Sequence, residues 1–310
     1  MYAITQRSFG GPGVLEPAEV DRPRPLPSEV LVRVRAASVN PVDAGVRSGA
    51  FPLLGEPPFI LGWDISGVVE EVVPGVTRFQ VGDEVYGMPF FPRPGNAYAE
   101  YVAVPSRQLA HKPAGLDHVH AAALPLAGLT AWQSLVDAAG VEAGQRVLIH
   151  AGGGGVGHLA VQIAKARGAE VIATAAAAKH DFVRSLGADQ VIDYRSADFT
   201  DIVTDADVVL DTVGGDYGHR SIRALRPGGL LVTVVGRTDT ELQAATLAAG
   251  RRFAGITVEP DHVGLEALTD LVDTGRLHPY VEHTLPLAEA AKAHQLVESG
   301  HTQGKIVLTL

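Results

Sequence analysis

The stretch His150-Ala151-Gly152-Gly153-Gly154-Gly155-Val156-Gly157 decides the fold. Three of its glycines, Gly152, Gly154 and Gly157, fit the pattern G-x-G-x-x-G, with an apolar strand predicted before them and a helix after them. In this context one glycine makes the strand-to-helix turn, the second lets the backbone approach a pyrophosphate, and the third lets helix and strand pack closely. The stretch therefore predicts a dinucleotide-binding loop at a helix N-terminus. A glycine-rich loop without a ligand is the alternative, and the flanking strand and helix argue against it.

Short apolar strands and helices alternate around and after this loop. The strands are predicted at residues 147–150, 171–174, 190–193, 208–211 and 230–235 and the helices at 156–167 and 179–186, followed by helices at 263–272 and 287–299 and a last strand at 306–310. Such alternation is typical of βαβ units around a parallel sheet. The sequence therefore predicts an α/β fold with a doubly wound parallel sheet.

The part of the chain before about residue 120 has a different character. It is rich in Pro and Gly and contains short alternating strands, predicted at residues 30–36, 65–73, 79–85 and 98–104. Few helices are visible there, so the pattern indicates a compact all-β unit. A length of 310 residues also favours two domains, at roughly 150 residues per domain.

Composition excludes several classes of protein. Hydrophobic residues make up 46% of the chain, which excludes disorder as its general state. The net charge is −10 without any run of Lys or Arg, so we expect no nucleic-acid partner. No apolar stretch approaches the roughly 20 residues of a membrane span, and no signal peptide is recognised, so we expect no membrane partner and a cytoplasmic location. The chain has no Cys, which excludes disulfides and thiolate zinc sites.

The residues after the second strand of the alternating region bear on the choice of cofactor. NAD-binding proteins place an acidic residue roughly 20 residues after the loop, on the ribose 2′-OH. Here Thr174 is followed by four alanines and then by Lys179. A 2′-phosphate would attract Lys179, although this residue could also simply begin a solvated helix. The missing acid predicts NADPH, and the internal position of the loop favours a nicotinamide cofactor over FAD.

Several motifs together support a resemblance that covers the whole chain. They are Asn40-Pro41-Val42-Asp43, Arg47-Ser48-Gly49, Leu61-Gly62-Trp63-Asp64-Ile65-Ser66-Gly67, Leu129-Thr130-Ala131, the glycine loop, Leu186-Gly187-Ala188-Asp189, Val191-Ile192-Asp193-Tyr194 and Gly304-Lys305-Ile306-Val307-Leu308. With these motifs the chain resembles the quinone oxidoreductase branch of the medium-chain dehydrogenase/reductase superfamily. The motifs are specific for the family and far less specific for a substrate.

The resemblance implies a domain organisation. A GroES-like β domain at residues 1–118 would carry the substrate and catalytic residues, and a Rossmann domain at 119–253 would bind NADPH. The segment 254–310 would return to the first domain, and the cofactor would lie in the cleft between the domains. Relatives commonly dimerise through an edge of the Rossmann sheet, so a homodimer is expected.

The resemblance also implies roles for individual residues. The expected cofactor-binding set comprises residues 151–157 of the glycine loop, Thr174, Lys179, Tyr194, Asp211, Thr212, Val213, Val235, Gly236 and Lys305. Within it, Lys179 and Tyr194 would flank the 2′-phosphate of the adenosine. Asn40 and Thr130 would be the catalytic residues beside the nicotinamide, and Asn40, Asp43 and Trp63 would contact the substrate.

Zinc dehydrogenases belong to the same superfamily, so the positions of their metal ligands matter. Those positions are occupied here by Asn40-Pro41-Val42-Asp43 and by Trp63, so no metal site is expected and zinc would not polarise the substrate. His118 and His120 could share one face of a strand, but no third ligand is evident nearby. An exposed loop is the interpretation that the sequence favours for this pair.

Some residues depart from the family pattern or have two interpretations. Gly45 stands where several quinone reductases of the family carry a Tyr, so solvent or another group would have to supply a proton. Asn40 is either a functional donor or the start of an Asn-Pro turn. Asp43 and Arg47 read best as an ion pair on a helix surface. Trp63 is either a core residue or a wall of the cleft.

The expected activity is the transfer of a hydride from NADPH to a small molecule, a quinone or an α,β-unsaturated carbonyl compound. Two alternatives remain open at this point. One is an enoyl reductase of a biosynthetic pathway with a specialised substrate. The other is a protein that binds NADPH without catalysis.

Overall fold

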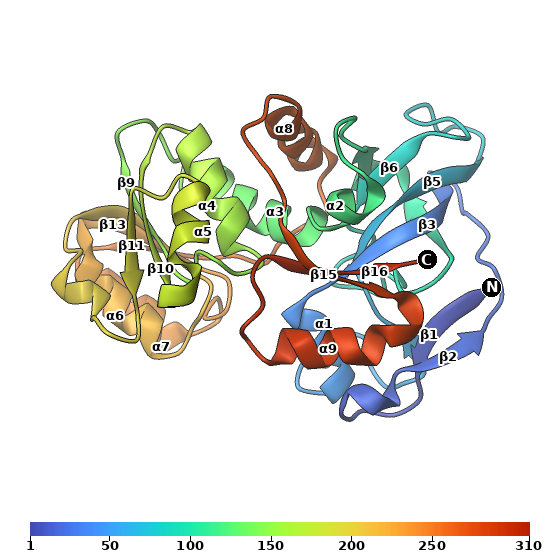
Figure 1. The fold of residues 1–310 in the computed structure, drawn as a ribbon, viewed down its shortest axis with the longest axis horizontal. Coiled ribbons are helices and arrows are strands. Elements are labelled where there is room, and N and C mark those ends of the chain that lie inside the picture. The colour runs from blue at the N-terminus through green and yellow to red at the C-terminus, as the bar shows by residue number, and fades with distance from the viewer. The chain divides into compact units, whose positions relative to one another are not determined.

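A computed structural model describes all residues, 1–310, and their contacts form two compact units. The first unit comprises Met1–Leu129, Glu259–Asp273 and Pro279–Leu310, and the second comprises Thr130–Val258 and Thr274–His278. The division after Leu129 comes later than residue 118, where the sequence analysis places it, because α2 (His118–Ala122) packs against strands of the first unit. Most of the C-terminal segment belongs to the first unit, which therefore holds both chain ends (Figure 1).

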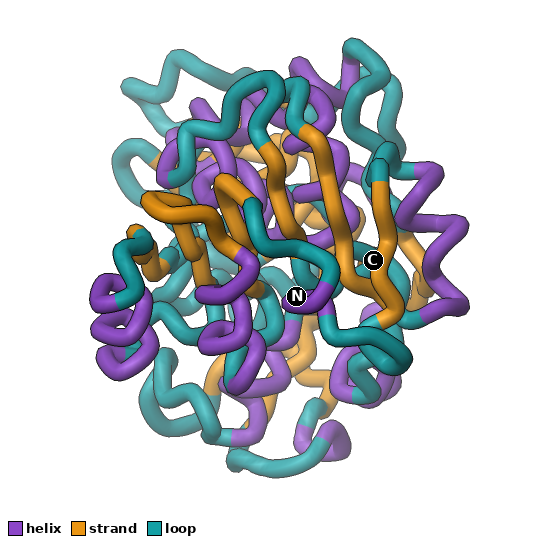
Figure 2. Tube along the Cα trace, turned by 90° about the vertical axis from the view of Figure 1, so that its left-hand side faces the viewer, coloured by secondary structure: helices purple, strands orange, loops and turns teal.

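The second unit is built on a six-stranded parallel sheet flanked by helices (Figures 1 and 2). In spatial order its strands are β11 (Gln190–Asp193), β10 (Glu170–Ala175), β9 (Arg146–Ile149), β12 (Ala206–Asp211), β13 (Leu225–Thr233) and β14 (Arg252–Gly255). Its helices are α4 (Gly157–Ala166), α5 (His180–Ser185), α6 (Asp216–Ala224) and α7 (Thr240–Ala248), preceded by α3 (Pro125–Trp132), which continues into a π-helical segment, Gln133–Ala138. The strand order reverses between β9 and β12, and ligands of such sheets bind at this switch point, at the carboxyl ends of the strands.

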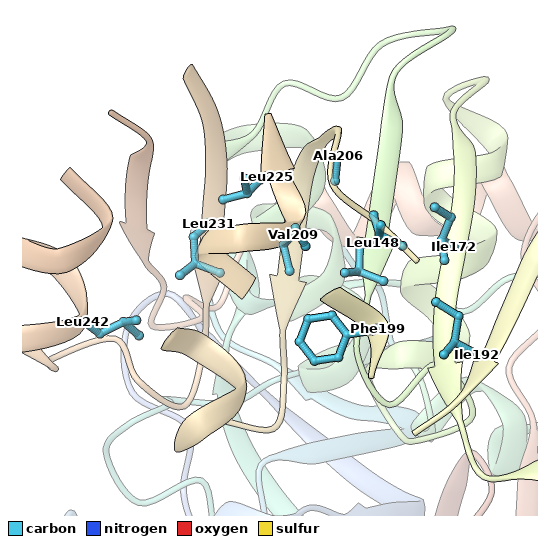
Figure 3. Packing of buried hydrophobic residues seen from close by; sticks show 11 residues of the cluster. Leu148, Ile172, Ile192, Phe199, Ala206, Val209, Leu225, Leu231 and Leu242 are labelled. Carbon is cyan, nitrogen blue, oxygen red and sulfur yellow. The ribbon is translucent and has the colours of Figure 1, made fainter. Parts of the chain in front are cut away.

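Side chains from neighbouring strands form the core of the second unit (Figure 3). Leu148 on β9 is in register with Ile172 on one side and with Val209 on the other, and Val209 is in register with Leu231. Residues in register on a sheet point to the same face, so these side chains cover one face together. The ring of Phe199 packs against that face. The near-continuous apolar runs of these strands are explained by burial on both faces.

The first unit contains a seven-stranded sheet and a small three-stranded sheet. The large sheet has the order β15 (Val281–Pro286), β16 (Lys305–Thr309), β3 (Glu29–Val39), β5 (Asp64–Val72), β6 (Glu84–Gly87) and β8 (Leu109–His111), with β7 (Tyr101–Pro105) also pairing with β3. The small sheet has the order β2 (Glu16–Glu19), β1 (Tyr2–Gln6) and β4 (Phe59–Ile60). The helices are α1 (Pro41–Ser48), α2, α8 (His262–Asp273) and α9 (Ala290–Glu298).

One expectation for the first unit needs correction. The strand expected at residues 79–85 is shorter and later, because residues 80–83 form a turn and only β6 is paired. The segment after Asn40 is a helix, α1, as the spacing of Asp43 and Arg47 suggests, and it begins with Pro41 at its first position, where the missing N–H of Pro costs nothing. As a separate finding, none of the helices is long and apolar enough to span a bilayer.

Candidate cofactor site and buried polar cluster

The glycine loop leaves β9 and enters α4 at Gly157, as the sequence predicts. A Cβ atom on Gly157 would lie 2.1 Å from the carbonyl oxygen of Ala151, and a Cβ atom on Gly152 would lie 2.7 Å from the Cβ of Ala173. Both positions therefore need glycine because backbone or the neighbouring strand approaches too closely. The first N–H groups of a helix have no partner in a preceding turn, and the helix dipole favours an anion there. The loop can thus bind a phosphate group through its backbone.

Replacing Gly157 with Ala tests this close approach. The added methyl group must displace backbone, so we expect a loss of about 1–3 kcal/mol in the free energy of unfolding, as for overpacked sites. Gly154→Ala is the matched control in the same loop, because its Cβ would lie 3.2 Å from the same carbonyl oxygen. Urea unfolding of both variants measures the difference. Equal stability of Gly157→Ala and the wild type would contradict the geometry.

Lys179 lies directly over the glycine loop. A Cβ atom on Gly153 would lie 3.0 Å from the Cδ of Lys179, so the aliphatic part of this side chain packs on the loop backbone. Tyr194, just after β11, is 43% exposed, and the guanidinium of Arg195 lies 5.6 Å from its ring centroid. Arg195 is a second cation beside Tyr194, and no motif in the sequence indicates it. β10 ends at the buried Ala175, and three more alanines follow before Lys179, so no acidic residue stands at the carboxyl end of this strand.

Hydrogen bonds fix the turns at the ends of β12 and β13. The Oδ1 of Asp211 accepts from the backbone N–H groups of Val213 and Gly214, each at 2.9 Å, and burial raises the pKa of this carboxyl group. The hydroxyl of Thr212 donates to the carbonyl oxygen of His150 at 2.9 Å, which ties the turn after β12 to the end of β9.

After β13, the N–H of Gly236 donates to the hydroxyl oxygen of Thr233 at 3.0 Å, and the neighbouring Val235 is exposed. Val213 is also exposed. The residues expected to bind cofactor in the second unit therefore lie at or after the carboxyl ends of β9 to β13, on one edge of one sheet.

A cluster of buried polar groups occupies the first unit, with Asp64 at its centre. Its carboxylate accepts from the amide nitrogen Nδ2 of Asn40 at 2.8 Å, from the backbone N–H of Leu126 at 2.7 Å and from the hydroxyl of Ser38. The ammonium of Lys305 lies 3.5 Å from the same carboxylate. Lys305 is 3% exposed and Asp64 is fully buried, so the pair satisfies two charges inside the protein.

Lys305 is therefore placed differently from the expectation that it binds cofactor. Its ammonium donates to the side-chain oxygen Oδ1 of Asn40 and, at 3.3 Å, to the carbonyl oxygen of Val39. Burial lowers the pKa of Lys305, and the nearby carboxylates of Asp64 and Asp43 oppose this shift. The three N–H groups of the ammonium are directed at acceptors of this cluster, which corrects the assignment of Lys305 to the cofactor.

Asn40 is the N-cap residue of α1 and is almost fully buried. Its backbone N–H donates to the carboxylate of Asp43 at 2.7 Å, and its side chain bonds to Asp64 and Lys305. The Asn-Pro pair therefore does initiate a local structure, in the form of a helix start. Thr130 is buried within α3, at the beginning of the second unit.

The expected surface ion pair between Asp43 and Arg47 is wrong, because both residues are buried. Arg47 instead binds Glu298 of α9 with its two terminal nitrogens, at 2.5 and 3.2 Å. Asp43 caps α1, and burial raises its pKa to about 7. Its carboxyl group is fully buried and caps the N-terminus of α1, so it is not exposed to a substrate.

Trp63 is a core residue in this structure. It is fully buried, its indole N–H donates to the carbonyl oxygen of Arg93 at 2.7 Å, and its ring meets Phe91 edge-on at 5.3 Å. Of the two interpretations of Trp63, the core is the one that these contacts support, and they correct its assignment to the substrate.

The ring of Phe51 covers Gly45. A Cβ atom on Gly45 would lie 2.1 Å from this ring, so a larger residue at position 45 would have to displace it. Phe51 is itself half-exposed. The ring of Phe51 therefore occupies the space next to Gly45 that a Tyr side chain at this position would need, and this ring has no hydroxyl group to donate a proton.

His118 and His120 do not lie in a loop, contrary to expectation, because they belong to α2. The two imidazoles have separate partners. His118 contacts the hydroxyl of Ser66 at 2.8 Å and the carboxylate of Glu84 at 3.2 Å, whereas His120 lies 2.7 Å from the carboxylate of Asp117. No group of three or more His, Asp or Glu side chains in the chain is arranged to hold a metal ion.

Comparisons with known families agree with this two-part architecture. A family model described as the alcohol dehydrogenase GroES-like domain matches residues 26–114, and one described as a zinc-binding dehydrogenase matches residues 186–308. The NADPH-dependent alkenal/one oxidoreductase of Arabidopsis thaliana, a chloroplast protein by name, is 35% identical over 99% of this chain and 79% of its own length.

Solved structures show the same similarity. The quinone oxidoreductase of Coxiella burnetii is 39% identical, with a TM-score of 0.95 over 100% of this chain and 99% of its own. The Escherichia coli quinone oxidoreductase, solved in complex with NADPH, is 28% identical, with a TM-score of 0.90 over 100% of both chains. The expected GroES-like and Rossmann-type parts are confirmed.

Proposed function

Because the chain belongs to the quinone oxidoreductase branch of the medium-chain dehydrogenase/reductase superfamily, we propose that it transfers a hydride from NADPH to a quinone or an α,β-unsaturated carbonyl compound, without zinc. Family membership makes it an oxidoreductase that depends on a nicotinamide cofactor. The observation that carries the choice of NADPH is Lys179, whose side chain packs on Gly153 of the glycine loop.

The residues of the second unit fit such a cofactor. The backbone N–H groups of the glycine loop suit a pyrophosphate, because they lie at the start of α4. Lys179 offers a cation beside the loop, and the exposed ring of Tyr194 offers a surface for the adenosine end. Thr174, Asp211, Thr212 and Gly236 hold these turns in place through hydrogen bonds. NADPH, when bound, supplies the hydride.

The polar cluster of the first unit supports a reaction without zinc. Zinc sites use Cys, His or carboxylate ligands. At the corresponding positions this chain has the amide of Asn40, already bonded to an ammonium and a carboxylate, and the buried indole of Trp63. The one carboxyl group there, that of Asp43, is fully buried and accepts from the backbone N–H of Asn40. This set of side chains does not suit a zinc ion. The positive charge beside the carboxylate of Asp64 is instead supplied by the ammonium group of Lys305.

Asn40 of the first unit stays the proposed donor to the substrate oxygen, and Thr130 of the second unit stays a proposed catalytic residue. An amide NH2 group has two hydrogens, and the bond to Asp64 uses one of those on Asn40. Reduction of a quinone or enone leaves an oxyanion or enolate, which hydrogen-bond donors stabilise. A proton from solvent then completes the reduction, because the family's Tyr is replaced by Gly45 and the ring above it is Phe51.

Turnover assays test this function. The oxidation of NADPH is followed with benzoquinone, phenanthrenequinone and an alkyl enone, and the series is repeated with NADH. Quinone or enone turnover with NADPH supports the proposal. If NADPH binds in a fluorescence titration but no quinone or enone is reduced, an enoyl reductase with a specialised substrate or a non-catalytic NADPH-binding protein takes its place. If NADPH does not bind, the cofactor assignment is wrong.

Lys179→Ala should weaken NADPH binding and leave NADH binding nearly unchanged. A hydrogen bond to a charged group contributes about 1.5–3 kcal/mol, which corresponds to an increase of roughly 10- to 100-fold in the Kd of NADPH. NADH is the internal control, because it has no 2′-phosphate. Equal weakening of both cofactors would show that Lys179 acts only by packing on the loop.

We also propose a homodimer and a cytoplasmic location. The outer edge of β14 has no partner strand in the monomer, so two copies could pair their sheets there. Light scattering of the purified chain measures the mass, and a monomer would contradict this proposal. The location stays a prediction, since one relative carries a chloroplast name; fractionation of the native cells tests it.

A further inference from the structure

His150 is a fully buried polar residue at the end of β9, immediately before the glycine loop. Both of its ring nitrogens have partners. The Nδ1 atom lies 3.2 Å from the hydroxyl oxygen of Thr174, and the Nε2 atom lies 2.9 Å from the hydroxyl oxygen of Ser221. The rings of Phe199 and Tyr217 pack edge-on against the imidazole, with centroids at 4.6 and 5.1 Å. The imidazole is thus fixed in position and in orientation.

The hydrogen bonds around the ring determine which nitrogen carries the hydrogen. The hydroxyl of Ser221 donates to the carbonyl oxygen of Tyr217 at 2.6 Å, so its oxygen is left to accept from Nε2–H of His150. A neutral imidazole has one N–H, so Nδ1 is an acceptor and receives the hydroxyl hydrogen of Thr174. The oxygen of Thr174 in turn accepts from the backbone N–H of Ala151 at 3.2 Å. In this series of hydrogen bonds, the side chains of Ser221, His150 and Thr174 each donate once and accept once.

The last of these hydrogen bonds, from Ala151 to Thr174, holds a strained residue of the glycine loop. Ala151 has a φ of +51°, in the left-handed region that side chains other than Gly rarely adopt. Such a conformation persists only where the surroundings hold it. The N–H of Ala151 is held by Thr174, and its carbonyl oxygen accepts from the N–H of Gly154 at 2.8 Å. Ala151 therefore sets the path of the loop up to the close approach at Gly157.

We propose that His150 is a positioning residue for the pyrophosphate of the cofactor, acting through Thr174 on Ala151 and hence on the N–H groups of the loop. The inference rests on the proposed function, since the loop must bind a dinucleotide. His150 does not contact the cofactor in this proposal. It keeps the hydroxyl of Thr174 pointing away from Ala151, so that the oxygen of Thr174 faces the N–H of Ala151.

Two substitutions separate this role from general stability. His150→Asn keeps a side-chain oxygen near the position of Nδ1, so it can still accept from Thr174. His150→Gln keeps a nitrogen near the position of Nε2, so it can still donate to Ser221 but no longer accepts from Thr174. Each variant loses the same ring packing and one hydrogen bond, and we expect similar falls in Tm.

The two variants should differ in cofactor binding. We expect His150→Gln to raise the Kd of NADPH about tenfold or more, and His150→Asn to recover most of that affinity. Thr174→Val and Thr174→Ser form a second pair of variants, because Val lacks the hydroxyl group that bonds to His150 and Ala151, whereas Ser keeps it. If Gln and Asn variants of equal Tm bind NADPH equally, the proposal is overturned.

Hydrogen exchange without cofactor tests the same point independently. The backbone N–H groups of residues 151–157 should exchange faster in His150→Gln than in His150→Asn, whereas those of the β12 core should not differ between the two. If the wild type binds no NADPH, the proposed function fails, and this exchange comparison still decides whether His150 holds the loop. Equal exchange rates at the loop would overturn the positioning role even if NADPH binds.

Discussion

Replacing Lys305 with Met should lower the free energy of unfolding by about 3–5 kcal/mol, the usual result when one partner of a buried ion pair is removed. The side chains of Lys305 and Asp64 are 3% and 0% exposed, so water cannot solvate the carboxylate that is left behind. The Oδ1 atom of Asn40 would also lose its donor. Urea unfolding of the variant and the wild type at neutral pH measures the loss.

Two further variants show whether the loss arises from charge. Adding Asp64→Asn to Lys305→Met removes the second buried charge, so the double variant should recover a large part of the lost stability. Lys292→Met is the matched exposed control. Its side chain is 59% exposed and pairs with Glu289 one turn away, a contact that contributes only a few tenths of a kcal/mol. A double variant as unstable as Lys305→Met would assign the effect to packing instead.

The fold around the glycine loop could be predicted because its signals are local. The strands β9, β10 and β12 and the second half of β13 contain short apolar runs, and a helix, a turn or a glycine that can be recognised in the sequence follows them. The first half of β13, Leu225–Gly229, has no such run and is not predicted. The same pattern predicts that the carboxyl ends of these parallel strands lie on one edge of the sheet. Lys179 is singled out by its place after the second strand, whereas the role of Tyr194 comes from the family resemblance, and both roles stay predictions. The elements α6, α7 and β14 lack an equally strong pattern in the sequence.

The polar cluster of the first unit could not be predicted in this way. Lys305 and Asn40 are separated by 265 positions, and Arg47 and Glu298 by 251. No local period records such pairings, because they depend on β16 joining the sheet beside β3 and on α9 packing on α1. Spacing alone therefore suggested a surface pair for Asp43 and Arg47, and tertiary packing placed both inside.

Buried titratable groups of both units should make stability depend on pH. Burial lowers the pKa of His150 and of His294, and together with the smaller effect of the nearby cations, Arg220 and Arg47 respectively, it brings each pKa to about 3. His294 is held between Arg47 and the hydroxyl of Tyr98, at 3.5 and 3.1 Å. Asp43 has the opposite behaviour, because burial raises its pKa from 3.8 to about 7.

The contributions of the two histidines and of Asp43 to stability depend on pH in opposite directions. In the unfolded chain each histidine takes up a proton near its ordinary pKa of 6.5, whereas the folded chain keeps it neutral down to about 3. The stability that each histidine contributes is thus complete above pH 6.5 and is lost as the pH falls from 6.5 towards 3. In this window the unfolding constant rises by up to about tenfold per pH unit for each histidine. The stability that protonated Asp43 contributes is complete below 3.8 and is lost as the pH rises through about 7.

Single variants should therefore change the slope of stability against pH in opposite directions. In wild type, the titration of His294 should raise the unfolding constant by up to about tenfold, or about 1.4 kcal/mol, for each pH unit between about pH 6.5 and 4.5. His294→Asn should remove this part of the loss of stability. Asp43→Asn should steepen the loss by a similar amount, because it removes a group that gains a proton on folding throughout this range. Urea unfolding at several pH values gives the slopes. Parallel curves for the wild type and both variants would show that neither group titrates differently in the folded protein.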